Sequence, residues 1–147
     1  MDHALQVVLI ESAKQMAQAH AIRRLVFIEE QHVPEELELD IEDQQAVHAL
    51  ALIDGHPVGC GRFVVHDSEV KIGRMAVLKN RRGEGIGQAI LESLMKEARR
   101  RGFQNAVLHA QLTAEGFYLK QGFVPKGEVF EEAGIRHRKM ERTLFAG

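Results

Sequence analysis

The chain has 147 residues, of which 45% are hydrophobic and 27% charged, and its formal net charge is −2; such a composition is typical of a globular domain large enough to bury one core. The near-neutral charge gives no support to a nucleic-acid-binding protein, and a single cysteine excludes an intrachain disulfide and a multi-cysteine zinc site. No apolar run reaches the roughly 18 residues of a membrane span and the first residues do not resemble a signal peptide, so we expect one cytoplasmic domain over residues 1–147 without membrane or nucleic-acid partners.

The first half of the chain carries four strand signals. Ser12 and Gln15 have the spacing of a capping box, which predicts a helix that runs, with a break, to about Gln31. The segment 32–45 is acidic and contains a proline, so it is predicted to be mostly loop. Asp54-Gly55 is a strong hairpin turn signal between two apolar runs. The predicted strands are Ala4–Ile10, Val47–Ile53, Pro57–His66 and Val70–Val77.

The second half begins with the clearest helix signal. Its apolar stripe comprises Ile86, Ile90, Leu91, Leu94, Met95 and Ala98, which recur at helical spacing, and Gly102 stands where a C-terminal cap belongs. A short helix is predicted over Thr113–Gln121. The remaining predicted strands are Ala106–Ala110, Phe123–Phe130 and Arg136–Leu144. This order predicts a mixed α/β sheet with antiparallel strands first and a parallel crossover at its centre.

Charge is distributed unevenly along the chain. Eight acids and no Lys or Arg lie between Glu29 and Asp43, whereas residues 74–101 contain eight bases and three acids. Either these regions are two solvated faces, or one receives a cationic ligand and the other an anionic ligand. On the second interpretation the acidic stretch favours a cationic amine, such as a polyamine, an amino sugar or a lysine side chain.

A glycine-rich segment joins the strand ending at Val77 to the apolar helix. It reads Arg82-Gly83-Glu84-Gly85-Ile86-Gly87. The first N–H groups of a helix lack internal partners and lie at the positive end of the helix dipole, so this junction suits a diphosphate, with Arg82 able to add a charged contact. The spacing matches neither a P-loop nor a G-x-G-x-x-G dinucleotide motif, but it fits Arg/Gln-x-x-Gly-x-Gly/Ala.

With this loop, the sequence resembles the GNAT superfamily of N-acetyltransferases, which bind acetyl-coenzyme A. The strand Met75-Ala76-Val77 before the loop and the segment Ala114–Phe123 after it, which contains Phe117-Tyr118 and Gly122-Phe123, look like further signatures of that family. The segments Val26–Gln31 and Phe130–His137 are similar to a small bacterial branch. The resemblance covers roughly Asp43 to the C-terminus and implies a mostly antiparallel sheet with a parallel, splayed centre flanked by helices.

The resemblance also implies where the coenzyme would bind. The strand residues Met75, Ala76 and Val77 would hold its pantetheine arm and polarise the thioester, and Gln111 would bond a pantetheine amide. The segment from Arg82 to Gln88 would hold the diphosphate. The implied diphosphate-site residues are Arg82, Gly83, Glu84, Gly85, Ile86, Gly87 and Gln88.

Acetyl transfer to an amine requires proton donors and acceptors. Tyr118, the only tyrosine in the chain, occupies the family's general-acid position and would protonate the leaving thiolate. Histone-modifying relatives carry a glutamate base where this chain has Lys71, so that base does not carry over. His109 is the candidate base or water-relay residue, and a packed core histidine is the competing interpretation. Three acids are weaker candidates: Glu29, Glu30 and Glu36.

These features together predict an acetyl-CoA-dependent N-acetyltransferase. It would move the acetyl group to a primary amine, on a small molecule or a lysine-type acceptor, by direct attack in a ternary complex and without a metal ion. The alternative is a non-catalytic module that binds or senses acetyl-CoA. A homodimer is possible by analogy with the family.

Overall fold

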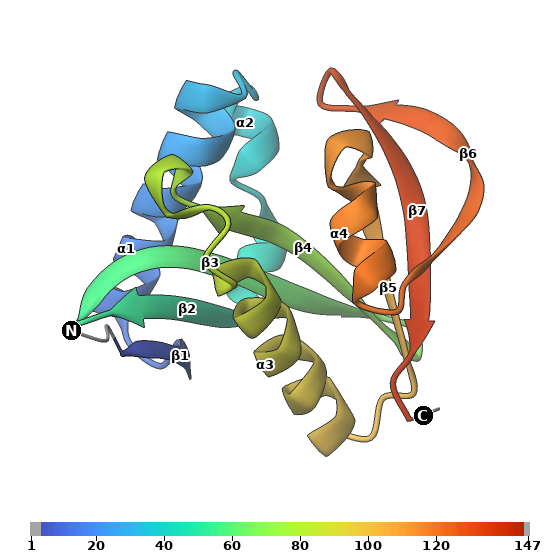
Figure 1. The fold of residues 1–147 in the computed structure, drawn as a ribbon, viewed down its shortest axis with the longest axis horizontal. Helices are drawn as coiled ribbons and strands as arrows, with labels where there is room; N and C mark the ends of the chain where they lie inside the picture. Colours follow the sequence, from blue (N-terminus) through green and yellow to red (C-terminus); the bar gives the residue numbers. More distant parts are fainter. Residues whose placement is uncertain (1–3, 146–147) are drawn as a thin grey trace.

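The computed structural model describes residues 4–145, which form one seven-stranded sheet with helices on both faces (Figure 1). The strands are β1 (Leu5–Leu9), β2 (Val47–Ile53), β3 (His56–His66), β4 (Glu69–Val77), β5 (Asn105–Gln111), β6 (Val124–Glu132) and β7 (Ile135–Thr143). Their spatial order is β1-β2-β3-β4-β5-β7-β6, and every neighbouring pair is antiparallel except β4 and β5. The predicted mixed, mostly antiparallel sheet with a parallel centre is confirmed.

Helices connect and cover these strands. The α-helices are α1 (Ala13–Arg23), α2 (Glu35–Glu38), α3 (Ile86–Arg100) and α4 (Glu115–Lys120). A π-helix continues α1 over Arg24–Glu30, and short 3-10 helices cover Ile41–Gln44, Lys79–Arg81 and Leu112–Ala114. The capping box at the start of α1 is present, because Ser12 Oγ accepts from the N–H of Gln15 and Gln15 Oε1 accepts from the N–H of Ser12. The predicted helix from Ser12 to about Gln31 therefore forms, with its break as a change from α- to π-helix.

Two clusters of buried side chains lie on opposite faces of the sheet. On one face α3 packs through Ile90, Leu91 and Leu94, all completely buried, while α1 covers the other face through Ala19 and Ile22. Glycines on β3 allow α3 to approach closely. A Cβ at Gly61 would lie 2.6 Å from Met75 Sδ and 2.9 Å from Ile90 Cγ2, so a larger residue would displace the helix from the sheet.

The parallel pair at the centre of the sheet is short. Only Val70–Ile72 of β4 pair with Ala106–Leu108 of β5, and beyond them the two strands diverge, as Figure 1 shows. A bulge in β4 adds to the divergence: the register with β3 shifts here, and Arg74 has a φ of +51°, a conformation uncommon for a residue with a Cβ. The predicted splayed centre is therefore present, and it opens at the C-terminal ends of β4 and β5.

The segment 32–45 differs from the expected loop. It contains α2 and the 3-10 turn Ile41–Gln44, and arginines from other elements hold it in place. Arg23 of α1, only 1% exposed, donates to the carboxylates of Glu38 and Asp43, and Arg62 of β3 donates to those of Asp40 and Asp43. These long-range ion pairs are the physical reason for the order of this segment. Among residues 4–145, no helix combines the length and apolar character needed to cross a membrane.

Candidate functional site

A cavity of about 1030 Å³ occupies the space between the diverging strands β4 and β5. One end reaches the glycine loop before α3, and the other end reaches α2 and the turn between β6 and β7. Its apolar lining includes Phe27, Val33 and Leu37 on one side and Phe117 and Tyr118 of α4 on the other. All but one of the predicted site residues line this cavity: Met75, Ala76, Val77, Arg82, Gly83, Gly85, Ile86, Gly87, Gln88, His109, Gln111 and Tyr118.

The glycine loop presents backbone to this cavity. Gly83 and Gly85 have φ values of +83° and +82°, which only glycine adopts readily, and no atom lies within 4 Å of the position that a Cβ would occupy at either residue. No side chain caps the N-terminus of α3, so its first N–H groups are available to a ligand. Open space, free amides and the positive end of a 15-residue helix fit a diphosphate group.

Two side chains of this loop form ion pairs within the protein. Arg82 forms a two-pronged ion pair with Glu30 at the end of the π-helix, at 2.7 and 2.8 Å, and its Nε donates to the carbonyl of Val77 at 3.0 Å. The hydrogen bonds that Arg82 donates to Glu30 raise the pKa of its guanidinium. Glu84 is the predicted site residue that does not line the cavity; it is exposed and pairs with Arg81 at 3.5 Å. The loop is thus tied to the opposite wall of the cavity.

Tyr118 lies on α4 with its ring packed edge-on against Phe117 and Phe123. The residue is 8% exposed and lines the cavity, and burial raises the pKa of its phenol to about 12. A phenol with this pKa remains protonated at neutral pH, so Tyr118 is available as a proton donor inside the cavity.

His109 and Gln111 lie at the end of β5, on the side of the cavity that faces α2. The Nδ1 atom of His109 lies 3.0 Å from Oε1 of Glu132. Gln111 donates a hydrogen bond of 2.9 Å to Gln31, which follows the π-helix. This bond links the two sides of the cavity, because β5 lies on one side of the divergence and the π-helix on the other.

Five of the eight carboxylates of the acidic stretch are paired with arginines, and Glu42, which lines the cavity, is paired with His66. Glu30, Glu35, Glu38, Asp40 and Asp43 each contact an arginine. Burial would raise the pKa of Asp43, but hydrogen bonds and charges from Arg23 and Arg62 outweigh it and lower the pKa to about 2. Much of the charge of this stretch therefore holds the wall of the cavity, and its preference for a cationic amine stays a prediction.

The three acids named as alternative bases do not line the cavity, unlike His109. Glu29 and Glu36 are exposed and do not line the cavity. Glu30 contacts Arg82, and this hydrogen bond lowers the pKa of its carboxyl, which makes it a weaker base. Of the candidate bases named from the sequence, His109 alone lines the cavity.

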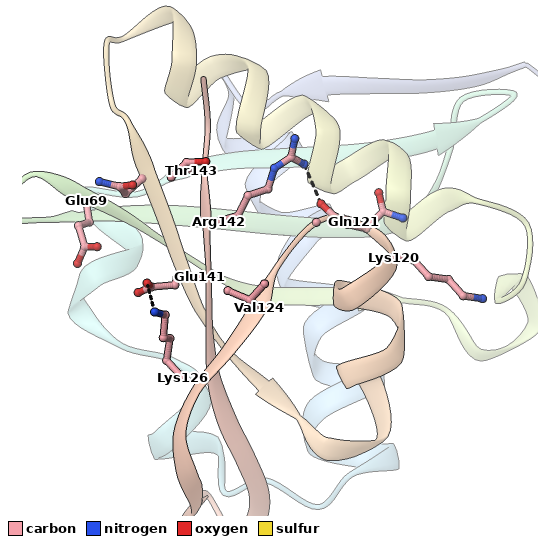
Figure 2. Close-up of a pocket in the computed structure, with 10 residues that line it drawn as sticks. Glu69, Lys120, Gln121, Val124, Lys126, Glu141, Arg142 and Thr143 are labelled. Atoms are coloured by element: carbon pink, nitrogen blue, oxygen red, sulfur yellow. Dashed lines mark hydrogen bonds and ion pairs between the residues drawn. The ribbon is translucent and has the colours of Figure 1, made fainter. Parts of the chain in front are cut away.

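A second hollow, of about 720 Å³, lies near the opposite ends of β4 and β5 (Figure 2). Three of its charged groups bond within the protein: Lys126 pairs with Glu141 at 3.3 Å, and Arg142 donates to the carbonyl of Gln121 at 2.7 Å. Figure 2 shows Lys120 pointing away from these groups. Within residues 4–145, no cluster of three or more His, Cys, Asp or Glu side chains has the arrangement of a metal site.

Comparison with known proteins agrees with this geometry. Residues 9–144 match the model of the acetyltransferase (GNAT) domain. The chain belongs to the GNAT acetyltransferase family. YjcF of Bacillus subtilis, an uncharacterised N-acetyltransferase, is 35% identical over 92% of this chain and 98% of its own. Its homologues and its fold identify this GNAT chain as an N-acetyltransferase.

Solved structures support the same assignment. An acyl-CoA N-acyltransferase of Pseudomonas aeruginosa superposes with a TM-score of 0.82 and 27% identity, over 96% of this GNAT chain and 99% of the other. An aminoglycoside 6'-N-acetyltransferase, solved with coenzyme A, has a TM-score of 0.78 over 97% and 98% of the two chains; at 16% identity it is evidence for the fold alone.

Two residues of the site escaped the sequence analysis. Glu132 lies between the strands predicted over Phe123–Phe130 and Arg136–Leu144, and Gln31 lies at the predicted end of a helix. Each contacts a residue of β5 that is far away in the sequence, 23 positions for Glu132 and 80 for Gln31. Each residue lies in a segment that resembles the bacterial branch named above. This resemblance was the signal in the sequence that could have pointed to them.

Proposed function

We propose that this protein transfers the acetyl group of acetyl-CoA to a primary amine by direct attack in a ternary complex. The observation that carries the proposal is the cavity between β4 and β5, which joins an open glycine loop at the start of α3 to a protonated, buried tyrosine and a histidine. A relative of the same fold was solved with coenzyme A, which supports the choice of donor.

Acetyl-CoA would supply an activated thioester, and the residues of this chain bind, orient and move protons around it. The amides before and within the first turn of α3 would hold the diphosphate. Backbone N–H groups of β4 beyond Ile72 have no partner on β5 and would donate to the pantetheine arm and to the thioester oxygen; one such donor contributes roughly 3 kcal/mol to catalysis. Tyr118 would give its proton to the departing sulfur.

Direct attack is supported by the position of the only thiol. Cys60 is 2% exposed, lies in the cluster between α1 and the sheet, and has a pKa raised to about 12 by burial. Because the thiolate is the nucleophilic form of cysteine, Cys60 is not suited to form an acyl-enzyme intermediate. The acceptor would instead enter from the side of α2, next to His109, which lines the cavity.

The test is a screen of primary amines with acetyl-CoA, read out as thiol release and confirmed by the mass of the acetylated product. We expect release that depends on both substrates, with initial rates that fit a sequential mechanism. A wild-type protein that binds acetyl-CoA but releases no thiol with any amine would favour the sensing module instead. Tighter binding of ATP or NAD than of acetyl-CoA would contradict the assignment of the loop.

A further inference from the structure

A histidine and a glutamate meet on the acceptor side of the cavity. His109 stands near the C-terminal end of β5, and Glu132 is the last residue of β6. The distance from Nδ1 to Oε1 is 3.0 Å, a normal hydrogen bond. Both residues line the cavity, and their side chains are 27% and 47% exposed, so a substrate in the cavity can reach the histidine.

The contact fixes which ring nitrogen carries the hydrogen. The hydrogen bond from His109 lowers the pKa of Glu132, against an opposing effect of burial, so this carboxylate is ionised at neutral pH. An ionised carboxylate only accepts hydrogen bonds. Nδ1 of His109 is therefore the donor, and in the neutral ring the lone pair available to a proton is on Nε2.

The neighbours of this pair hold it in place. Phe130 packs edge-on against the His109 ring, with centroids 5.0 Å apart, and stacks on His137 at 5.9 Å. His137 is buried; its Nδ1 lies 2.7 Å from the carbonyl of Ile135, and its Nε2 lies 3.8 Å from Glu132 Oε2. The charged and titratable groups that act on Glu132 are thus His109, His137 and Lys71 of β4.

We propose that Glu132 is a positioning residue that holds His109 as the general base for the acceptor amine. The inference rests on the proposed acetyl transfer and adds a residue to it. An N–H bond of the acceptor ammonium breaks, a bond forms between that hydrogen and Nε2, and the electron pair left on nitrogen becomes the nucleophile. The imidazolium that results is stabilised by the Glu132 carboxylate, and its proton then passes from Nε2 to solvent.

The first experiment observes the ring without any substrate. In ¹⁵N-labelled wild-type protein above neutral pH, nitrogen chemical shifts are expected to show His109 protonated on Nδ1 and bare on Nε2. Glu132→Ala removes the acceptor and is expected to shift the ring towards the Nε2–H form. Glu132→Gln keeps an acceptor oxygen and is expected to retain much of the Nδ1–H form. An Nε2–H ring in the wild type would overturn the proposal, whatever the activity.

The second experiment measures turnover of the same proteins. We expect His109→Gln to lower kcat about a hundredfold, the usual contribution of a general base. We expect Glu132→Ala to lower it about tenfold, the scale on which a carboxylate supports a metal-bound histidine. Glu132→Gln is expected to fall between Glu132→Ala and the wild type, with the acidic limb of its kcat/KM profile at lower pH. The KM for acetyl-CoA should not change, because the contacts of Glu132 are with His109 and His137 and not with the glycine loop.

Glu131→Gln is the matched control, since it removes an exposed carboxylate from the adjacent position of β6, and it should behave as the wild type. Equal kcat and equal pH profiles for all variants, with an active wild type, would overturn the role of Glu132 while leaving acetyl transfer intact. A higher KM for the amine with unchanged kcat would also overturn it, because Glu132 would then bind the acceptor. A wild type without activity would overturn acetyl transfer itself.

Discussion

Tyr118 is the residue on which acid catalysis depends in this proposal. Its hydroxyl has no hydrogen bond to the protein among those found in residues 4–145, so removing the hydroxyl breaks no hydrogen bond of the fold. We expect Tyr118→Phe to lower kcat about a hundredfold, the contribution typical of a general acid, with the dissociation constant of coenzyme A and the unfolding midpoint nearly unchanged. Turnover equal to that of the wild type from about pH 6 to 9 would remove Tyr118 from this role.

The single tyrosine also allows a direct measurement of its ionisation. The chain has one tyrosine and no tryptophan, so near-ultraviolet difference absorption reports the phenol of Tyr118 alone. Because burial raises its pKa to about 12, the phenolate should appear well above the usual range for tyrosine, unless the protein unfolds first. A transition near pH 10, with the fold intact by circular dichroism, would contradict the burial of this side chain.

A substitution at Gly85 tests whether the glycine loop binds the diphosphate. Its left-handed backbone and the open space around it predict that Gly85→Val weakens coenzyme A binding at least tenfold by calorimetric titration, because the side chain enters the space that the ligand needs. A non-glycine residue in this conformation also costs about 1–2 kcal/mol in stability.

Gly127 provides the control for that strain. It has a φ of +79° and equally open surroundings, but it lies in β6 outside the cavity. Gly127→Val should therefore lower the unfolding free energy by a similar amount and leave coenzyme affinity unchanged. Equal affinities in both variants and the wild type would contradict the assignment of the glycine loop.

At the scale of elements, α2 and the turn after it depend on buried charge pairs. Asp43 has a pKa lowered from its usual 3.8 to about 2 in the folded protein, so it stabilises the fold above pH 4 by about 2 kcal/mol, and this contribution is lost as pH falls from about 4 to 2. Asp43→Asn should be destabilised at neutral pH by at least that amount, since Arg23 and Arg62 lose a counter-charge.

The difference between Asp43→Asn and the wild type should shrink as the pH falls through that range, measured by denaturant unfolding at each pH. Glu36→Gln, an exposed carboxylate of α2, is the control and should change stability by less than about 0.5 kcal/mol. If the difference in unfolding free energy between Asp43→Asn and the wild type were constant with pH, Asp43 would not titrate in this way.

Elements whose causes are local were predictable from the sequence. The bounds of β2 were predicted as Val47–Ile53 because Asp54-Gly55 marks its turn. The glycine loop was found because glycines indicate a backbone with positive φ values. The order of the segment 32–45 was not predictable, since it depends on arginines that lie far away in the sequence, for example 20 positions for Arg23 and Asp43 and 36 for Arg74 and Glu38. The bulge at Arg74 was also missed, because it requires a positive φ at a residue that rarely adopts one.

The contact between Glu132 and His109 shows why the site itself was only partly predictable. It depends on the turn that joins β6 to β7 and on the register of β7 against β5. A residue pattern with period two cannot reveal such a contact, because it indicates the face on which a side chain lies but not the strand that lies beside it. The sequence therefore identified the histidine but not the carboxylate that orients it.

For the whole molecule, the two parts of the sheet share only the short pairing of Val70–Ile72 with Ala106–Leu108. A ligand that donates to and accepts from both diverging strands would join these parts more firmly. It would also compete with Glu30 for Arg82, an ion pair that is exposed and therefore weak. Binding in the cavity should thus stabilise the whole fold rather than one loop.

This leads to a prediction for coenzyme A and thermal unfolding. At a concentration about 100 times its Kd, a ligand that binds only the folded state adds about 2.7 kcal/mol, which for a chain of this size raises the unfolding midpoint by about 5–10 °C. Backbone amides of β4 beyond Ile72 should exchange hydrogen more slowly in the complex. Gly85→Val should show smaller effects at the same concentration, because a tenfold weaker affinity leaves at most about 1.4 kcal/mol of this stabilisation. Stabilisation of Gly85→Val equal to that of the wild type would mean that coenzyme A binds elsewhere, because the cradle before α3 would then be dispensable.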